Sequence, residues 1–280
     1  MKLLAFETAT EACSVALYLD GEIIERYEIA PRLHAEYALP WAEALLADAG
    51  IKRSQLDAIA ISRGPGAFTG VRLAIAIAQG IALALDKPVV AISTLQVIAA
   101  SSQAVGQPRP HTTKGSFVGA QESSTSSRVA DEAGLHGRDG NPLPASSQTG
   151  MQSLRILAAI DARMGEVYVG AFERRGDEVI AISAETVCAP QAVMLPDNEG
   201  GWHGAGTGFS AVEGALALHL GTQLSSIDAS TLPHAADVAR LAVAAYARGE
   251  ALAPERIEPA YLRNNVALTL EEQKALRASR

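Results

Sequence analysis

Cysteine is scarce in this chain: of 280 residues, only Cys13 and Cys188 carry a thiol. The two form neither a CxxC pair nor a spacing typical of a metal site, which excludes a disulfide-rich secreted domain. The six histidines are scattered, with no pair three or four residues apart, so no metal site is expected. We therefore expect two reduced thiols in the core of a cytoplasmic protein.

Basic residues are also in deficit. Twenty-three Lys and Arg face 31 Asp and Glu, which leaves a formal net charge of −8. A stand-alone protein that binds nucleic acid through charge normally shows a basic stripe, so this class is excluded. If RNA is involved, a partner must supply most of the positive charge.

Long apolar runs are missing as well. The longest covers 13 residues, from Leu73 to Leu85, and Gln79 interrupts it. A span of the bilayer needs about 20 apolar residues. Near the N-terminus, Glu7 follows four apolar residues, too early for a signal peptide. We expect no membrane association.

The first hundred residues do contain a regular α/β pattern. Three apolar strands come first, the last two joined by an Asp20–Gly21 turn, and helices then alternate with strands. The expected elements are strands at 3–6, 13–19 and 22–29, a helix at 31–49, a strand at 57–62, a helix at 69–85 and a strand at 88–92. This order is that of a ribonuclease-H-like α/β unit.

Residues 101–153 break this pattern. Thirty of these 53 residues are Ser, Thr, Gly, Gln or Pro, and only seven are apolar apart from alanine. Such a segment buries too little apolar surface to offset the entropy lost when it is ordered. We predict a disordered insertion between a first lobe (1–100) and a second lobe (154–267), followed by a tail (268–280).

The second half repeats the pattern of the first. In both halves a strand ends in an acid, Glu7 or Asp161, and a second strand, a glycine turn and further apolar residues follow. The expected elements of this half are strands at 156–160, 167–172, 180–187 and 201–203, a helix through 219 and a helix at 235–248. Repetition of a whole unit predicts two similar lobes that face each other, although hairpins also resemble one another by chance.

The two equivalent acids invite a functional interpretation. If Glu7 and Asp161 faced each other from two lobes, they would be able to hold a magnesium–nucleotide complex. The alternative is that each carboxylate caps the turn after its own strand. The residues leave both interpretations open.

The stretch 63–72 is the most distinctive motif. It lies between a strand and a helix, where backbone N–H groups and the helix dipole favour an anion. It is not a Walker A loop, because no Lys-Ser/Thr pair follows Gly70, and its glycine spacing is not that of a dinucleotide fingerprint. Two interpretations remain: an anion site built on Gly64, Gly66 and Gly70, or a tight turn in which Thr69 caps the helix.

The helix after this loop is apolar nearly all round, which predicts that it is wholly buried. Two series of small residues with four-residue spacing would let another helix approach closely. They are Ala74, Ala78 and Ala82, and Ala76, Gly80 and Ala84. Burial inside the chain is one explanation. We favour a subunit interface, because the helix at 31–49 also offers a large apolar face.

Four motifs together resemble the bacterial TsaB (YeaZ) family. They are FETATEACSVAL at 6–17, GPGAFTGVR at 64–72, AIDARMGEVY at 159–168 and PAYLRNNV at 259–266. Their order is that of the family, and they lie on both sides of the insertion.

This resemblance implies a two-lobed fold of the actin/Hsp70/sugar-kinase type and a role in making threonylcarbamoyladenosine beside the tRNA anticodon. It implies a non-catalytic subunit that pairs with a catalytic paralogue, TsaD, while a small ATPase, TsaE, completes the complex. The family also forms homodimers through a similar surface. The chain itself would need no cofactor: tRNA, and ATP or ADP with Mg²⁺, would be bound through the assembled complex.

The resemblance also implies a location for the partner interface, on the helices at 31–49 and 69–85. Its expected residues are His34, Trp41, Leu45, Arg72, Ala74, Ile77, Ala78 and Ile81.

A degenerate nucleotide cleft is a further implication. The superfamily's first nucleotide loop usually carries Asp, and here Glu7 stands in its place, one methylene longer. The expected cleft residues are Glu7, Thr8, Asp161, Gly204, Gly206 and Gly208. The alternative function is an independent ATP-dependent phosphotransferase or ATPase of the same fold, which would need Glu7 and Asp161 to hold Mg²⁺.

Overall fold

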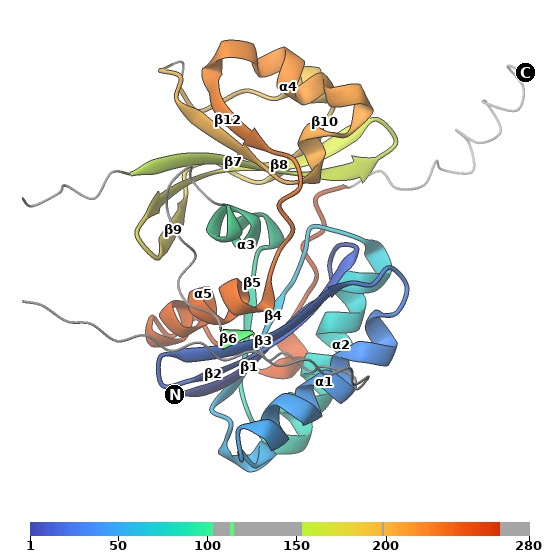
Figure 1. Ribbon diagram of the computed structural model, residues 1–280, viewed down its shortest axis with the longest axis vertical. Coiled ribbons are helices and arrows are strands. Elements are labelled where there is room, and N and C mark those ends of the chain that lie inside the picture. The colour runs from blue at the N-terminus through green and yellow to red at the C-terminus, as the bar shows by residue number, and fades with distance from the viewer. Residues whose placement is uncertain (103–112, 115–152, 198, 264–280) are drawn as a thin grey trace, which may run out of the picture.

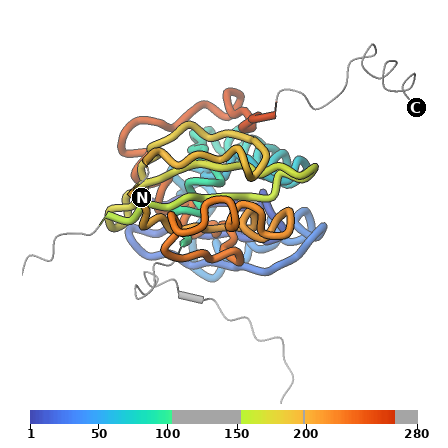
Figure 2. Tube along the Cα trace, turned by 90° about the horizontal axis from the view of Figure 1, so that it is seen from above, coloured from blue at the N-terminus to red at the C-terminus, as the bar shows by residue number. Residues whose placement is uncertain are grey.

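The computed structural model describes residues 1–102, 113–114, 153–197 and 199–263. These residues form two lobes, each built on a mixed β-sheet (Figure 1). Seen from above, the second lobe lies over the first (Figure 2).

The first lobe begins with an antiparallel meander, as predicted. Its elements are β1 (Lys2–Glu7), β2 (Ala12–Leu19), β3 (Glu22–Ile29), α1 (His34–Asp48), β4 (Ala58–Ser62), α2 (Phe68–Leu85), β5 (Val89–Ile92) and α3 (Thr94–Ser101). The sheet order is β5-β4-β1-β2-β3-β6, in which β1 is antiparallel to β2 and parallel to β4. The strand β6 (Thr113–Lys114) pairs with β3 in parallel, inside the segment predicted to be a disordered insertion. Most of that insertion, and the tail at 268–280, lie outside the described residues.

The second lobe repeats this arrangement. Its elements are β7 (Leu154–Arg163), β8 (Glu166–Arg175), β9 (Glu178–Ala181), β10 (Thr186–Cys188), β11 (Trp202–Ala205), α4 (Ala215–Leu220) and β12 (Leu224–Asp228). The hairpin β7–β8 corresponds to β1–β2, and the parallel strands β11 and β12 correspond to β4 and β5. The predicted duplication and the ribonuclease-H-like class of both lobes are confirmed. The single strand expected at 180–187 is instead two, β9 and β10, and β12 was not predicted.

Side-chain alternation decides which helices cover each face of the first sheet. Leu4 and Phe6 of β1 point into a cluster with α1 and α2, whereas Leu3 and Ala5 point into a cluster with α3 and α5 (Ala235–Ala247). Both faces are therefore buried by helices.

The helix α5 belongs to the first lobe in space although it follows the second lobe in sequence. It packs on β1, β2, β4 and β5, and Figure 1 shows it beside the first sheet. The predicted boundary, which assigned 154–267 as a whole to the second lobe, is therefore wrong for α5. Hydrophobic periodicity identifies a helix but carries no information about which sheet the helix will cover.

Within this chain the helix α2 is buried on one side only, and the favoured subunit interface on its other side stays a prediction. Its side facing the sheet contributes Val71, Ala74, Ile75, Ala78 and Ala82 to the core, and the opposite side is exposed. At 18 residues and a mean hydropathy of 1.7, it is long and apolar enough to cross a membrane by length and composition. We expected the apolar run in this region to be too short to span a membrane, and the helix does not meet that expectation. Packing on the sheet accounts for the apolar side of α2 that contains Ala74 and Ala78.

Two glycines of α2 make a matched test of this packing. A Cβ at Gly70 would collide with the carbonyl oxygen of Thr8, whereas a Cβ at Gly80 would meet nothing within 4 Å. We expect Gly70→Ala to lower the free energy of unfolding by about 1–3 kcal/mol or more. Gly80→Ala should raise it by up to about 1 kcal/mol, since alanine favours helix. Urea unfolding at one protein concentration measures both, and equal effects would contradict this account.

Candidate functional site

The carboxyl group of Glu7, at the end of β1, is fully buried. Its Oε1 accepts a hydrogen bond from the backbone N–H of Ala9 at 2.6 Å, and its Oε2 has no hydrogen-bond partner among the described residues. Burial raises the pKa of Glu7 to about 7, although the neighbouring Ser62 hydroxyl and the Ala9 N–H act to lower it. Burial thus favours the protonated, uncharged form of this carboxyl group.

Two hydroxyl groups near strand ends of the first sheet are also buried. Ser62 ends β4, the strand paired in parallel with β1, and Thr94 begins α3. Like Glu7 Oε2, the hydroxyl oxygens of Ser62 and Thr94 are buried and have no hydrogen-bond partner in the described part of the chain. The carboxyl ends of these strands therefore hold polar groups in a place where a charge is costly.

Asp161, the equivalent acid of the second lobe, is engaged within its own turn. Its Oδ1 accepts the backbone N–H of Arg163 at 2.8 Å, and its Oδ2 pairs with the exposed guanidinium of Arg163 at 2.7 Å. Glu7 and Asp161 thus make the same bond, in which each carboxylate accepts the backbone N–H two residues later. This is the geometry of the turn-capping alternative.

The described residues contain no group of three or more His, Cys, Asp or Glu side chains that could hold a metal ion. A role of Glu7 and Asp161 in holding a nucleotide stays a prediction.

The glycine loop 64–70 is seated on the loop that follows β1. The backbone N–H of Ala67 donates to Ala9 O at 2.7 Å, and the buried hydroxyl of Thr8 donates to Gly70 O at 2.7 Å. A Cβ at Gly66 would collide with Ala9 O. Of the two interpretations of this motif, the contacts fit the tight turn. Thr8, expected in a nucleotide cleft, uses its hydroxyl group for this packing.

The predicted helix cap is wrong. Helix α2 begins at Phe68, its N-cap is Ala67, and no side chain caps it. Thr69 is exposed and lies one residue inside the helix. The loop is held by its backbone contacts to residues 8 and 9, so a hydroxyl cap is not needed.

The second glycine loop, 204–208, packs against β7 in a similar way. A Cβ at Gly206, whose φ is 103°, would collide with Ala159 O, and one at Gly208 would lie 2.6 Å from Ala159 Cβ. At Gly204 a Cβ would meet the Phe209 ring at 2.5 Å. Close packing within the lobe therefore explains all three glycines without a bound nucleotide. Their contact with a nucleotide stays a prediction.

Three of the predicted interface residues lie in the protein's own core. Leu45, Ala74 and Ala78 are at most 1% exposed, because they face the first sheet. They cannot touch a partner directly, and the prediction is wrong for them. Periodicity alone does not show which of the two small-residue series of α2 packs on the sheet. In the structure it is the series that contains Ala74 and Ala78.

The remaining predicted interface residues are partly exposed. Trp41 stacks on Tyr37, with ring centroids 5.0 Å apart, and His34 Nε2 lies 3.0 Å from Thr10 O and 3.1 Å from Ala12 O. His34 thus fastens α1 to the loop after β1. Ile77 and Ile81 flank the exposed side of α2, and Arg72 lies at its N-terminal end.

The exposed side of α2 carries the second small-residue series. We define the outer α2 face by its exposed residues Phe68, Ala76, Gly80, Leu83 and Ala84. Phe68 is 69% exposed and Leu83 is 63% exposed, so this face presents two large apolar side chains to solvent. The sequence showed the spacing of Ala76, Gly80 and Ala84, but it did not show that these residues lie on the side of α2 that faces solvent.

The sequence assigned no role to the C-terminal motif, and the structure places it against both lobes. The guanidinium of Arg72 lies 3.3 Å from the centre of the Phe68 ring and donates to the Tyr261 hydroxyl at 2.5 Å. Arg263 donates to Ala162 O at 3.2 Å and pairs with Glu166, in the β7–β8 hairpin. This segment thus joins the start of α2 to the second lobe. Its last residues, 264–266, lie outside the described part.

Comparison with known proteins decides the family. The chain is 35% identical over 280 aligned residues to the Escherichia coli protein named tRNA threonylcarbamoyladenosine biosynthesis protein TsaB, covering 95% of this chain and 96% of that one. This chain belongs to the TsaB family. The Haemophilus influenzae TsaB is 34% identical, with 95% of each chain covered.

Structural comparison agrees with the TsaB assignment. The solved structure of YeaZ from Pseudomonas aeruginosa is 39% identical, with a TM-score of 0.70, 93% of this chain covered and 99% of that one. A family model described as TsaD, tRNA N6-adenosine threonylcarbamoyltransferase, matches residues 23–113. The resemblance stated from the four motifs is therefore confirmed, and with it the two-lobed fold.

The raised pKa of Glu7 predicts a pH-dependent stability. An acid whose pKa is about 7 when folded and about 4.3 when unfolded stabilises the protein below the lower value. That contribution, about 4 kcal/mol, is lost as the pH rises from the unfolded to the folded pKa. We expect Glu7→Gln to remove this dependence, because the amide stays neutral.

The measurement is the difference in unfolding free energy between wild type and Glu7→Gln from about pH 5 to pH 8. Glu11→Gln, a substitution of an exposed acid in the same loop, is the control and should parallel the wild type. A difference between wild type and Glu7→Gln that stays constant over this range would contradict the assignment.

Proposed function

We propose that this chain is a non-catalytic subunit of the complex that transfers threonylcarbamoyl to the adenosine beside the tRNA anticodon. The observation that carries the proposal is the full-length match to relatives named as tRNA threonylcarbamoyladenosine biosynthesis proteins. The match of the TsaD family model to residues 23–113 supports a common origin with a transferase, which is the expected partner.

The state of the two acids supports a non-catalytic role. A carboxylate that binds Mg²⁺ must be ionised and accessible. Glu7 is buried, with a pKa raised to about 7, and Asp161 already binds the backbone and side chain of Arg163. Under this proposal, ATP or ADP and Mg²⁺ are handled by the assembled complex.

An independent phosphotransferase or ATPase gains no support from the comparisons. The relatives reported above are named for tRNA modification rather than for nucleotide hydrolysis.

The outer α2 face is the surface proposed for the catalytic partner. It is apolar, it exposes Phe68 and Leu83, and its small residues Ala76 and Gly80 permit close approach of another helix. A second copy of this chain would use the same face, so homodimer and heterodimer would compete. The net charge of −8 suits a subunit whose partners, TsaD and the small ATPase TsaE, hold the tRNA.

A drop-out reconstitution tests the proposed function. Threonylcarbamoyladenosine on tRNA is measured with TsaD, TsaE, ATP and threonylcarbamoyl-AMP, with and without this chain. Product should form only when the chain is present. If its omission changes nothing, the chain is not a required subunit.

A pair of substitutions tests the proposed surface. Leu83→Glu places a charge on the outer α2 face without entering the core, and should weaken binding to TsaD by about 30-fold or more. Leu218→Glu, on α4 of the second lobe at 80% exposure, is the matched control and should bind normally. Isothermal titration with the folded variants gives both affinities. Equal affinities for the two would place the interface elsewhere.

A further inference from the structure

The short helix α3 lies between the two lobes and contacts elements of both (Figure 1). Six of its eight residues are buried. Its neighbours are β7, β8 and β9 in the second lobe and α5 in the first. An eight-residue helix has little stability of its own, so tertiary contacts must hold it.

The N-terminal half of α3 is tied to the second lobe at two points. The hydroxyl of Ser93, the N-cap, accepts the backbone N–H of Leu95 at 3.1 Å and donates to the carboxyl group of Glu185. Burial raises the pKa of Glu185, whereas the bond from Ser93 lowers it. One turn later, Gln96 Nε2 donates to Val179 O of β9 at 2.8 Å.

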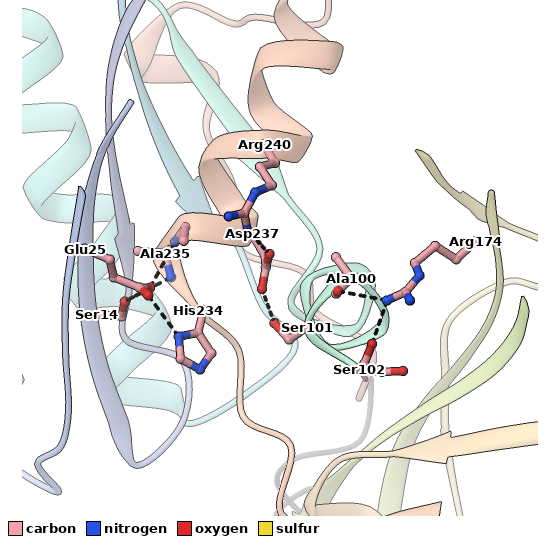
Figure 3. A network of polar contacts seen from close by, with 11 residues as sticks. Ser14, Glu25, Ala100, Ser101, Ser102, Arg174, His234, Ala235, Asp237 and Arg240 are labelled. Carbon is pink, nitrogen blue, oxygen red and sulfur yellow. Dashed lines mark hydrogen bonds and ion pairs between the residues drawn. The ribbon is translucent and has the colours of Figure 1, made fainter. Parts of the chain in front are cut away.

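The C-terminal end of α3 is tied to β8 (Figure 3). The guanidinium of Arg174 donates to Ser102 O at 2.6 Å and to Ala100 O at 3.3 Å. A cation at these carbonyl groups satisfies acceptors that the helix leaves open and complements the helix dipole. Contacts from the second lobe thus reach α3 at its start, middle and end.

A second set of bonds ties α3 to the first lobe through α5. The buried hydroxyl of Ser101 donates to Asp237 at 2.7 Å, and Asp237 is itself paired with Arg240 at 2.5 Å. Because Asp237 and Arg240 both lie on α5, this helix is fastened to α3 from the side opposite Arg174 (Figure 3).

The start of α5 is in turn anchored to the first sheet. Ser14 of β2 accepts the backbone N–H of Ala235 at 3.0 Å, and Glu25 of β3 accepts that of Ala236 at 3.0 Å. Glu25 also accepts from Ser14 at 2.7 Å and pairs with His234 at 3.1 Å. Burial opposes ionisation of Glu25, but these bonds and the nearby His234 outweigh it and hold its pKa below the usual value.

Apolar packing follows the same route. One continuous core cluster contains Leu3 of β1, Leu95 and Ile98 of α3, and Ile156 and Phe172 of the second sheet. Buried apolar side chains therefore fill the space between the lobes. Polar bonds join α3 to β8 on one side and to α5 on the other.

We propose that α3 is a clamp that locks the two lobes into one rigid body, with the same angle between them before and after a ligand or partner binds. Hinge closure of two domains needs a connection that absorbs large backbone changes. Here α3 is bonded to the second lobe at its start, middle and end, and to α5 at its last residue. The proposal does not depend on the role in tRNA modification.

The test is a distance measurement between the lobes. Spin labels are placed at Glu22→Cys on β3 and Leu218→Cys on α4, both exposed, in a Cys188→Ser background in which Cys13 is buried. Pulsed electron paramagnetic resonance is recorded on full-length protein, diluted with unlabelled chain. We expect one narrow distance, unchanged by Mg-ATP. Two distances, a broad distribution, or a shift with Mg-ATP would overturn the proposal.

Two variants, Arg174→Met and Arg175→Met, distinguish the loss of the bonds to α3 from the loss of one positive charge. Arg175 is the next residue, is exposed, and forms its ion pair with Glu173 of its own strand. Arg174→Met should broaden the distance distribution and speed hydrogen exchange of α3 amides by about 10- to 100-fold. Arg175→Met should do neither.

A distribution as narrow in Arg174→Met as in Arg175→Met would also overturn the proposal. Should Arg174→Met fail to fold, Gln96→Leu is used in its place, since it removes one bond to β9 and keeps the apolar packing. The same broadening is expected of it, and a wild-type distribution would count against the clamp.

Discussion

The first sheet is apolar on both faces, and the need to cover both is the constraint on which the rest of the structure depends. Helices α1 and α2 follow the meander directly and cover the face that contains Leu4 and Phe6. The opposite face, with Leu3 and Ala5, is covered by α5, which comes only after the whole second lobe. Burial of apolar surface, the main force that stabilises a domain, therefore also joins the two lobes.

The same burial changes the chemistry at the end of β1. Glu7 continues the alternation of Leu3 and Ala5 and so points to the face that α5 covers. In a site open to water, a glutamate there would be an anion. Buried beside Ser62, it has a pKa near 7, and its one described bond holds the following turn. The two glycine loops also serve packing, since their missing Cβ atoms let strand and loop backbones approach closely.

Covering one face of the sheet leaves α2 with a second apolar face. The side with Ala74 and Ala78 is used by the sheet, and the side with Gly80 and Leu83 is left in solvent. A helix that is apolar all round needs cover on both sides, and in the described part of the chain Phe68 and Leu83 of α2 remain exposed. That excess of apolar surface is the physical ground for proposing a partner subunit.

Local periodicity, turn residues and short motifs were enough to predict the two repeated α/β units, the order of most of their strands, the family and the two equivalent acids. Contacts between residues far apart in the chain set the phase of α2, the return of α5 to the first sheet and the contacts of Tyr261 and Arg263 with both lobes. Ala78 and Gly80 look alike in the sequence, since both are small residues in an apolar helix. Which of them is buried depends on where a sheet lies in space, and that is set by pairings between residues far apart in the chain.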